Sequence, residues 1–206
     1  MSINETTIPL EWLTPAIAVL ALLLSAGHIW VSQFWRGRVF LTQPMIFYFG
    51  WDDRQEESVP KIMLRAALFS EGVRGQVVEA LSILVKNADG EFEFALWGYD
   101  EGHGLMRGSG IFIGSAGHIA YHHFNPVDAE HTFAYSGTDY EVKVLAKLFG
   151  RRSPTVLGRY QLSLDQEIEG IPLAHGEVGV IWNWSMQEDC YYREVSRRPT
   201  GKLEIL

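Results

Sequence analysis

The stretch YEVKVLAKLF, from Tyr140 to Phe149, alternates apolar and charged side chains over almost its whole length. Its apolar positions are Tyr140, Val142, Val144, Ala146 and Leu148, and its charged positions are Glu141, Lys143 and Lys147. Because successive side chains of a β-strand point to opposite faces, this pattern predicts a strand with one face in the core and the other in water.

Other segments repeat this signal on both sides of it. Short runs rich in aromatic and β-branched residues occupy 45–51, 92–99, 110–114, 118–124, 155–164 and 178–185, and Gly, Pro, Asp and Asn lie between them. Segments 62–69 and 77–85 match helical as well as strand spacing. We interpret both as strands, since neither has a clear capping signal and their neighbours are strands.

About eight or nine short strands in residues 45–199 predict a mainly β domain, an antiparallel immunoglobulin-like β-sandwich with two layers. The chain has one cysteine, Cys190, so it has no internal disulfide framework of the antibody type. A single cysteine also agrees with a reducing compartment.

The N-terminal region is of a different kind. No charged residue lies between Glu11 and Arg36, and residues 12–35 read WLTPAIAVLALLLSAGHIWVSQFW. As a helix, 24 residues extend about 36 Å, which exceeds a hydrocarbon core of about 30 Å. The segment 12–35 therefore predicts one transmembrane helix that contacts membrane lipid. Aromatic side chains that suit the two membrane interfaces stand near its ends, at Trp12, Trp30 and Trp35.

The charges around this helix predict its orientation. Arg36 and Arg38 follow it, whereas only acidic side chains precede it. Because basic residues stay on the cytoplasmic side, we expect residues 1–11 to form a short extracytoplasmic N-terminus and the rest to be cytoplasmic. Residues 36–44 then form a juxtamembrane linker and residues 200–206 a C-terminal tail.

The net charge of −8 limits the partners of the protein. It argues against nucleic-acid binding, which needs a basic surface to exchange for counterions. Residues 39–206 carry 15 basic and 23 acidic side chains, since Arg36, Arg38, Glu5 and Glu11 are the only charges before them. An acidic domain is repelled by an anionic leaflet, so we expect it to stand away from the membrane on residues 39–44.

Residues 108–124, GSGIFIGSAGHIAYHHF, resemble the segment of trypsin-like bacterial serine proteases that leads from Gly-Ser-Gly to the catalytic histidine. In this chain the position of that histidine is occupied by Phe124, and His123 lies one residue too early. One residue of slip turns a strand side chain to the opposite face. No Gly-x-Ser-Gly-Gly nucleophile turn follows, so we reject a protease and interpret the stretch as a hairpin around the GSAG turn.

Four histidines within 14 residues raise the question of a metal site. His122, His123 and His131, with Asp128, are the candidate ligands, since imidazole and carboxylate suit Zn²⁺. His118 shares a strand face with His122 but is about 13 Å away along the strand, too far to share an ion directly. His122 and His123 point to opposite faces. We favour a polar and aromatic hairpin near a sheet edge over a metal site.

The apolar segment with its IAVLALLLSAG core, the RGR that follows it, and a β-rich body with RGSGIFIG and HHF together resemble an uncharacterised group of small bacterial membrane-tethered proteins. The resemblance implies a bacterial inner-membrane location and no chemistry. We therefore expect a non-enzymatic protein without a cofactor, whose β-sandwich binds a protein partner. The alternatives are a metal-binding or hydrolytic domain at residues 118–131 and an accessory subunit of a larger membrane complex.

Overall fold

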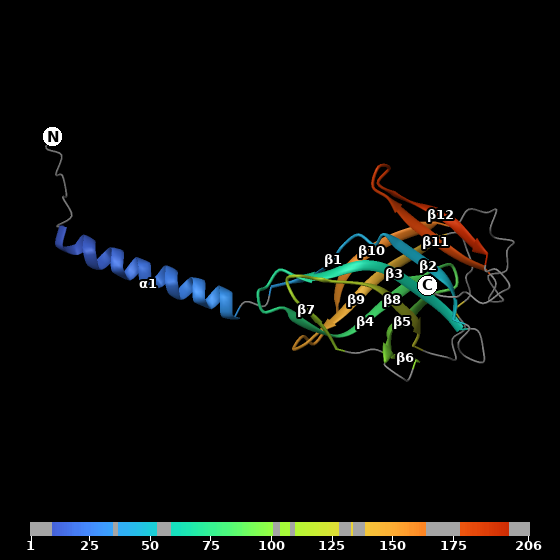
Figure 1. The fold of residues 1–206 in the computed structure, drawn as a ribbon, viewed down its shortest axis with the longest axis horizontal. Helices are drawn as coiled ribbons and strands as arrows, with labels where there is room; N and C mark the ends of the chain where they lie inside the picture. The colour runs from blue at the N-terminus through green and yellow to red at the C-terminus, as the bar shows by residue number, and fades with distance from the viewer. Residues whose placement is uncertain are drawn as a thin grey trace.

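The computed structural model describes residues 10–34, 37–52, 59–100, 104–107, 110–127, 133, 139–163 and 178–197. Helix α1, Leu10–Phe34, extends away from a β domain along the long axis of the molecule (Figure 1). The strands are β1 Val39–Leu41, β2 Ile46–Asp52, β3 Val59–Ser70, β4 Gln76–Lys86, β5 Glu91–Asp100, β6 Gly104–Arg107, β7 Ile111–Ile113, β8 His118–Pro126, β9 Asp139–Leu148, β10 Thr155–Ser163, β11 Val178–Ser185 and β12 Cys190–Arg197.

Helix α1 is long and apolar enough to cross a membrane. Residues Trp12–Phe34 carry no charged side chain, and none of the most apolar stretch is buried against the rest of the protein. The β domain therefore folds without using this helix as part of its core.

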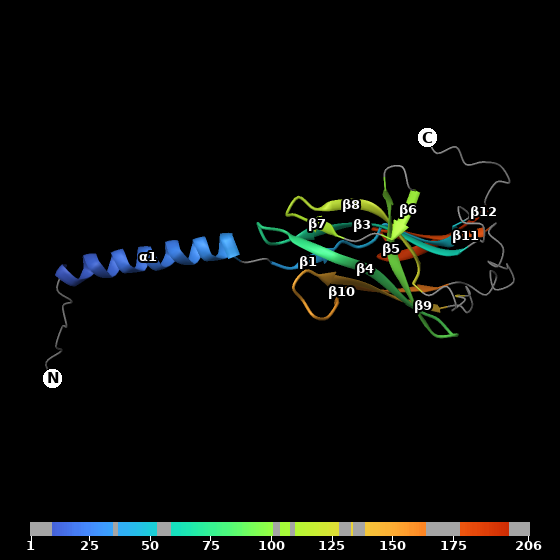
Figure 2. The ribbon, with the colours of Figure 1, turned by 90° about the horizontal axis from the view of Figure 1, so that it is seen from below.

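The domain is mainly β, as the sequence predicts, and its described strands form one antiparallel sheet. The strand order is β10-β9-β4-β5-β8-β3-β2-β11-β12, and the sheet curls until it is nearly a barrel (Figures 1 and 2). The immunoglobulin-like sandwich is not confirmed. The described strands belong to one sheet because two long strands each pair with three neighbours. β3 pairs with β1, β2 and β8, and β4 pairs with β5, β7 and β9.

The period-two patterns correctly predict which side chains face the interior. Every apolar position of β9 named above is buried, whereas its charged positions are half-buried or exposed. Segments 62–69 and 77–85 are strands, inside β3 and β4. Both have apolar side chains on each face over part of their length, and this is why their spacing also fits a helix.

Aromatic side chains fill the interior of the curled sheet and join strands from near its two ends. Phe49 of β2 contacts Tyr140 of β9 and Trp182 of β11, with ring centroids 5.5 Å and 4.9 Å apart. The indole Nε1 of Trp182 donates a hydrogen bond to the carbonyl oxygen of Ser163 at the end of β10, at 3.1 Å. Strands β10 and β11 are far apart in the strand order, so this bond joins regions that the backbone pairing leaves apart.

The sheet begins within the segment that the sequence assigns to a juxtamembrane linker. β1 pairs with the end of β3, and the backbone N–H of Thr42 donates to the carbonyl oxygen of Ala67 at 2.9 Å. Gly37, two residues before β1, has φ +70° and packs against the buried Gly72, where any Cβ would overlap the Gly72 backbone. The chain is thus attached to the domain within three residues of the end of α1.

The Trp182 hydrogen bond predicts the effect of a conservative substitution. Trp182→Phe keeps an aromatic ring but leaves the Ser163 carbonyl without its indole donor and the interior less completely filled. We expect a loss of about 2 kcal/mol in the free energy of unfolding, measured by urea denaturation of the detergent-solubilised protein. Trp184→Phe is the control, since Trp184 is half-buried and should cost less than about 1 kcal/mol. Equal losses for the two variants would contradict this role of Trp182.

Candidate functional site

The histidine-bearing strand lies in the middle of the sheet. β8 pairs with β3 on one side and with β5 on the other, whereas β7 pairs with β4. β7 and β8 do flank the GSAG turn, in which the N–H of Gly117 donates to the carbonyl oxygen of Gly114 at 3.1 Å. They do not form the expected hairpin at a sheet edge, because each is paired with a different long strand.

Within β8 the histidines divide between the two faces, as predicted. His122 lies opposite Leu64 and faces the interior, where only 3% of its surface is exposed. His123 lies on the other face, between Met63 of β3 and Trp97 of β5. The register therefore keeps these two imidazoles from acting on one ion from the same side of the sheet.

His118 and His122 are closer than the sequence predicts. Their ring centroids are 6.1 Å apart, whereas the rise of a strand separates their backbones by about 13 Å. The rings approach because side chains on one face of a strand can lean toward each other. His131 and Asp128 lie outside the described residues, and the described part of the chain contains no group of three or more His, Cys, Asp or Glu side chains placed to hold a metal ion.

The interior position of His122 changes its protonation. The pKa of His122 is lowered to about 4, mainly by burial and also by its electrostatic interaction with His118, whereas a hydrogen bond with the Ala66 backbone acts in the opposite direction. At neutral pH the imidazole of His122 is therefore uncharged. Its Nε2 is buried and has no hydrogen-bond partner among the described residues.

A second surface lies at the end of the domain next to α1. Four segments form it: 37–38, 70–75, 114–117 and 149–154. Backbone hydrogen bonds tie most of them together, from Glu71 N–H to the Arg38 carbonyl at 3.0 Å and from Ser70 N–H to the Gly114 carbonyl at 3.2 Å. We call these segments, together with Phe112 of β7, the helix-proximal surface.

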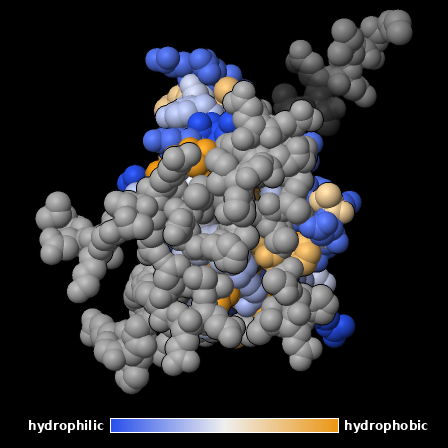
Figure 3. Space-filling view, turned by 90° about the vertical axis from the view of Figure 1, so that its right-hand side faces the viewer, coloured by the Kyte–Doolittle hydropathy of each residue, from blue (hydrophilic) through white to orange (hydrophobic). Residues whose placement is uncertain are grey.

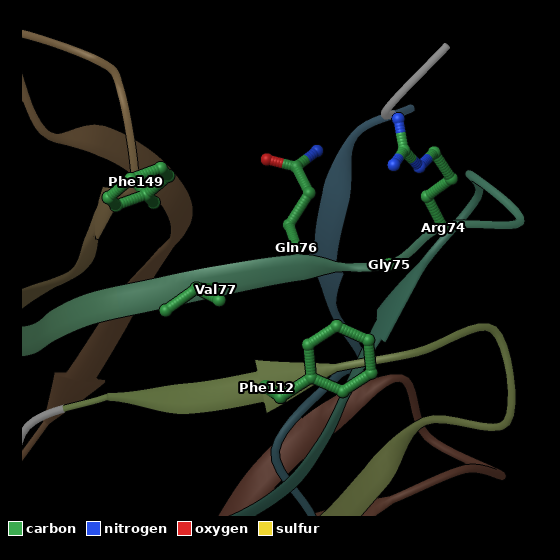
Figure 4. A pocket seen from close by; sticks show the side chains of 6 residues that line it. All are labelled: Arg74, Gly75, Gln76, Val77, Phe112 and Phe149. Atoms are coloured by element: carbon green, nitrogen blue, oxygen red, sulfur yellow. The ribbon is translucent and has the colours of Figure 1, made fainter. Parts of the chain in front are cut away.

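Large apolar side chains stand exposed on the helix-proximal surface. The exposed fractions are 77% for Val73, 64% for Phe112 and 58% for Phe149. Phe112 and Phe149 border a hollow of about 220 Å³ whose other lining residues are Arg74, Gly75, Gln76 and Val77. Figure 4 shows the two phenyl rings on either side of β4, with the polar ends of Gln76 and Arg74 rising beside them.

The helix-proximal surface is basic although the protein is acidic. Its four segments contain the basic residues Arg38, Arg74, Arg151 and Arg152 and the single acidic residue Glu71. In the part of the chain that the structure describes, no ion pair joins Arg74, Arg151 or Arg152 to an acidic side chain. The Nζ of Lys147 donates to the carbonyl oxygens of Arg151 and Arg152, which holds the turn that carries these side chains.

The sequence analysis did not predict this surface, because it considered only the net charge of the whole domain and not the local distribution of arginines. The available signal was local: the turns SEGVRG and FGRRSP each place arginine beside an exposed apolar residue. Only the pairing of β4 with β7 and β9 brings the two turns together with Phe112.

The structure describes three of the five residues that the sequence predicts at the membrane interfaces. Trp12 and Trp30 are exposed on α1, and the Trp30 ring stacks on that of Phe34 with centroids 4.8 Å apart. Arg38 is exposed where the chain enters the domain. Trp35 and Arg36 lie outside the described residues.

No protein-family model, curated protein or solved structure matches this chain.

The buried, uncharged His122 predicts a pH dependence of stability. Its pKa is about 4 in the folded protein and near 6.5 when unfolded, so protonation favours unfolding. The free energy of unfolding is therefore unaffected by His122 above about pH 6.5. It falls by about 3 kcal/mol in total as the pH is lowered from about 6.5 to 4, because His122 binds a proton more tightly in the unfolded chain. His122→Leu should remove this part of the pH profile in urea unfolding experiments.

His118→Gln is the control for this effect. It removes the neighbouring charge but leaves the His122 ring buried, so most of the slope between about pH 6.5 and 4 should remain. A His122→Leu profile parallel to that of the unmodified protein would show that another group is responsible.

Proposed function

We propose that this protein is a non-enzymatic, single-pass membrane protein that presents its β domain to a protein partner at the membrane surface. The observation that carries the proposal is the apolar helix Trp12–Phe34, of which none is buried by the domain. An unshielded helix of this length is unfavourable in water and favourable in a bilayer, where its backbone hydrogen bonds are already satisfied.

The proposal includes an orientation in a bacterial inner membrane. Arg36 and Arg38 follow α1 within four residues in the sequence, and Glu11 lies at the beginning of α1. Basic residues are retained on the cytoplasmic side, so this arrangement supports an extracytoplasmic N-terminus and a cytoplasmic β domain.

The part of the domain best suited to a partner is the hairpin β11–β12. It projects from the sheet in Figure 1, and Figure 3 shows a largely hydrophilic projection at the top of the view. Met186 at its turn and Tyr192 on β12 are exposed, and β12 forms one end of the described strand order. An end strand offers backbone N–H and C=O groups that a strand of another protein can pair with.

Substitution of two central apolar residues of α1 by arginine should abolish membrane attachment. Leu22→Arg combined with Leu23→Arg costs about 3 kcal/mol per residue in a bilayer. We expect the unmodified protein to remain in membranes after alkaline extraction and the double variant to be released. Leu22→Ile with Leu23→Ile is the matched control and should behave as the unmodified protein does.

Fusions of a reporter protein to the C-terminus test the orientation. A C-terminal fluorescent protein should be bright and a C-terminal alkaline phosphatase inactive if the domain is cytoplasmic. Release of the unmodified chain by alkali would contradict the anchor, and an active phosphatase would contradict the orientation.

Photocrosslinking tests the partner surface in living cells. A benzoyl-phenylalanine placed at Met186 or Tyr192 should give one discrete, light-dependent product of higher mass. The same group at Ala88, in the exposed turn between β4 and β5, should not. Products of the same pattern from all three positions, or none from the hairpin, would argue against β11–β12 as the partner site.

A further inference from the structure

We propose that the helix-proximal surface binds the phospholipid headgroups of the membrane that α1 enters, so that the β domain lies against the bilayer instead of standing away from it. This inference rests on the membrane anchor of the proposed function. It replaces the expectation that residues 39–44 separate an acidic domain from an anionic leaflet.

Chain length brings this surface to the membrane. The 23 residues Trp12–Phe34 extend about 35 Å as a helix, slightly more than a hydrocarbon core of about 30 Å. Gly37 follows Phe34 by three residues, so their Cα atoms are at most about 11 Å apart. A headgroup layer is about 5–7 Å thick, so the domain end that contains Gly37 lies within reach of it.

The attachment of Gly37 determines which end of the domain faces the bilayer. Its carbonyl oxygen accepts a hydrogen bond from the side-chain amide of Gln76 at 2.8 Å, and its backbone packs against Gly72. Gln76 itself lines the hollow between Phe112 and Phe149. The chain therefore leaves the domain beside the exposed aromatic side chains, and not at the opposite end of the sheet.

The chemistry of the surface fits a headgroup layer. Val73, Phe112 and Phe149 are more than half exposed, and apolar side chains in such a position gain by entering the boundary between headgroups and acyl chains. Arg74, Arg151 and Arg152 offer planar donors suited to phosphate oxygens. An acidic protein that places four basic side chains and one acidic side chain at its membrane end has the charge complement of an anionic lipid surface.

Lys147 stabilises the backbone of segment 149–154 within the helix-proximal surface. Its ammonium group holds the carbonyl oxygens of the turn 149–154, and the N–H of Phe149 donates to the carbonyl oxygen of Val77 at 2.9 Å. The backbone that carries Phe149, Arg151 and Arg152 is thus fixed on the sheet before any lipid is bound, so little ordering of this backbone opposes binding.

The experiment measures the distance of two positions from the lipid headgroups. Full-length protein with Cys190→Ser and either Val73→Cys or Ala88→Cys carries a fluorophore on its single cysteine. It is placed in nanodiscs of phosphatidylglycerol and phosphatidylcholine that contain a headgroup-nitroxide lipid as quencher. Position 88 follows the end of β4, whose 11 residues extend about 36 Å from the helix-proximal surface.

We expect strong quenching at position 73 and almost none at position 88. Equal and weak quenching at both positions, in protein that co-elutes with the nanodiscs, would overturn lipid binding by this surface while leaving the anchor intact. Protein that does not co-elute with nanodiscs would instead overturn the anchor and, with it, this inference.

Charge substitutions test the role of the arginines. Arg74→Gln, Arg151→Gln and Arg152→Gln together should lower the ratio of docked to undocked domain by roughly a hundredfold, since each arginine near an anionic surface contributes roughly a factor of five. Arg65→Gln, Lys86→Gln and Arg159→Gln make the same change in net charge away from this surface and should leave quenching at position 73 unchanged. The same loss from both triple variants would overturn the specific role of the three arginines.

Discussion

The structure depends on one constraint: a single sheet with one apolar face must curl until different parts of that face pack against each other. The described strands leave no second sheet and no packed helix to cover that face, since α1 lies outside the core. Curling lets β2, β9 and β11 contribute Phe49, Tyr140 and Trp182 to one interior cluster. The hydrogen bond from Trp182 to the Ser163 carbonyl then links two regions that no described backbone ladder connects. The antiparallel pairing of β4 with β9 brings the turns that bear Arg74 and Phe149 to one end of the domain.

That end gives the β domain an electrostatic polarity that the net charge of −8 hides. Basic and aromatic side chains gather where the chain leaves toward α1, whereas Glu91 of β5 and Glu141 of β9 form ion pairs with Lys143 of β9. A domain of this kind has one orientation in which both its charge and its apolar side chains match a bilayer. In the orientation that we propose, the β11–β12 hairpin projects to the side of the long axis that α1 defines (Figure 1).

The histidines show how far spacing in the sequence can be used. Alternation correctly placed His122 and His123 on opposite faces, because the direction of a strand side chain is a local property. It did not predict that His122 faces the barrel interior beside Leu64, or that the His118 and His122 rings approach to 6.1 Å. Those facts depend on which strands flank β8. The hairpin prediction failed for the same reason, since β7 found a partner in β4 that no turn signal between 108 and 124 could reveal.

By itself the sequence determined the class of most segments: a long apolar helix near the N-terminus, and strands whose buried faces can be read from period-two alternation, as in Tyr140–Phe149. It did not identify the strands at 39–41, 104–107 and 190–197. Hydrophobicity and side-chain direction act over a few residues, so they are legible without the fold. The tertiary structure alone decided that the strands form one curled sheet and that Gly37 packs on Gly72. It also decided that arginines from two distant turns meet two exposed phenylalanines. These outcomes follow from pairings between residues far apart in the chain, which local patterns do not specify.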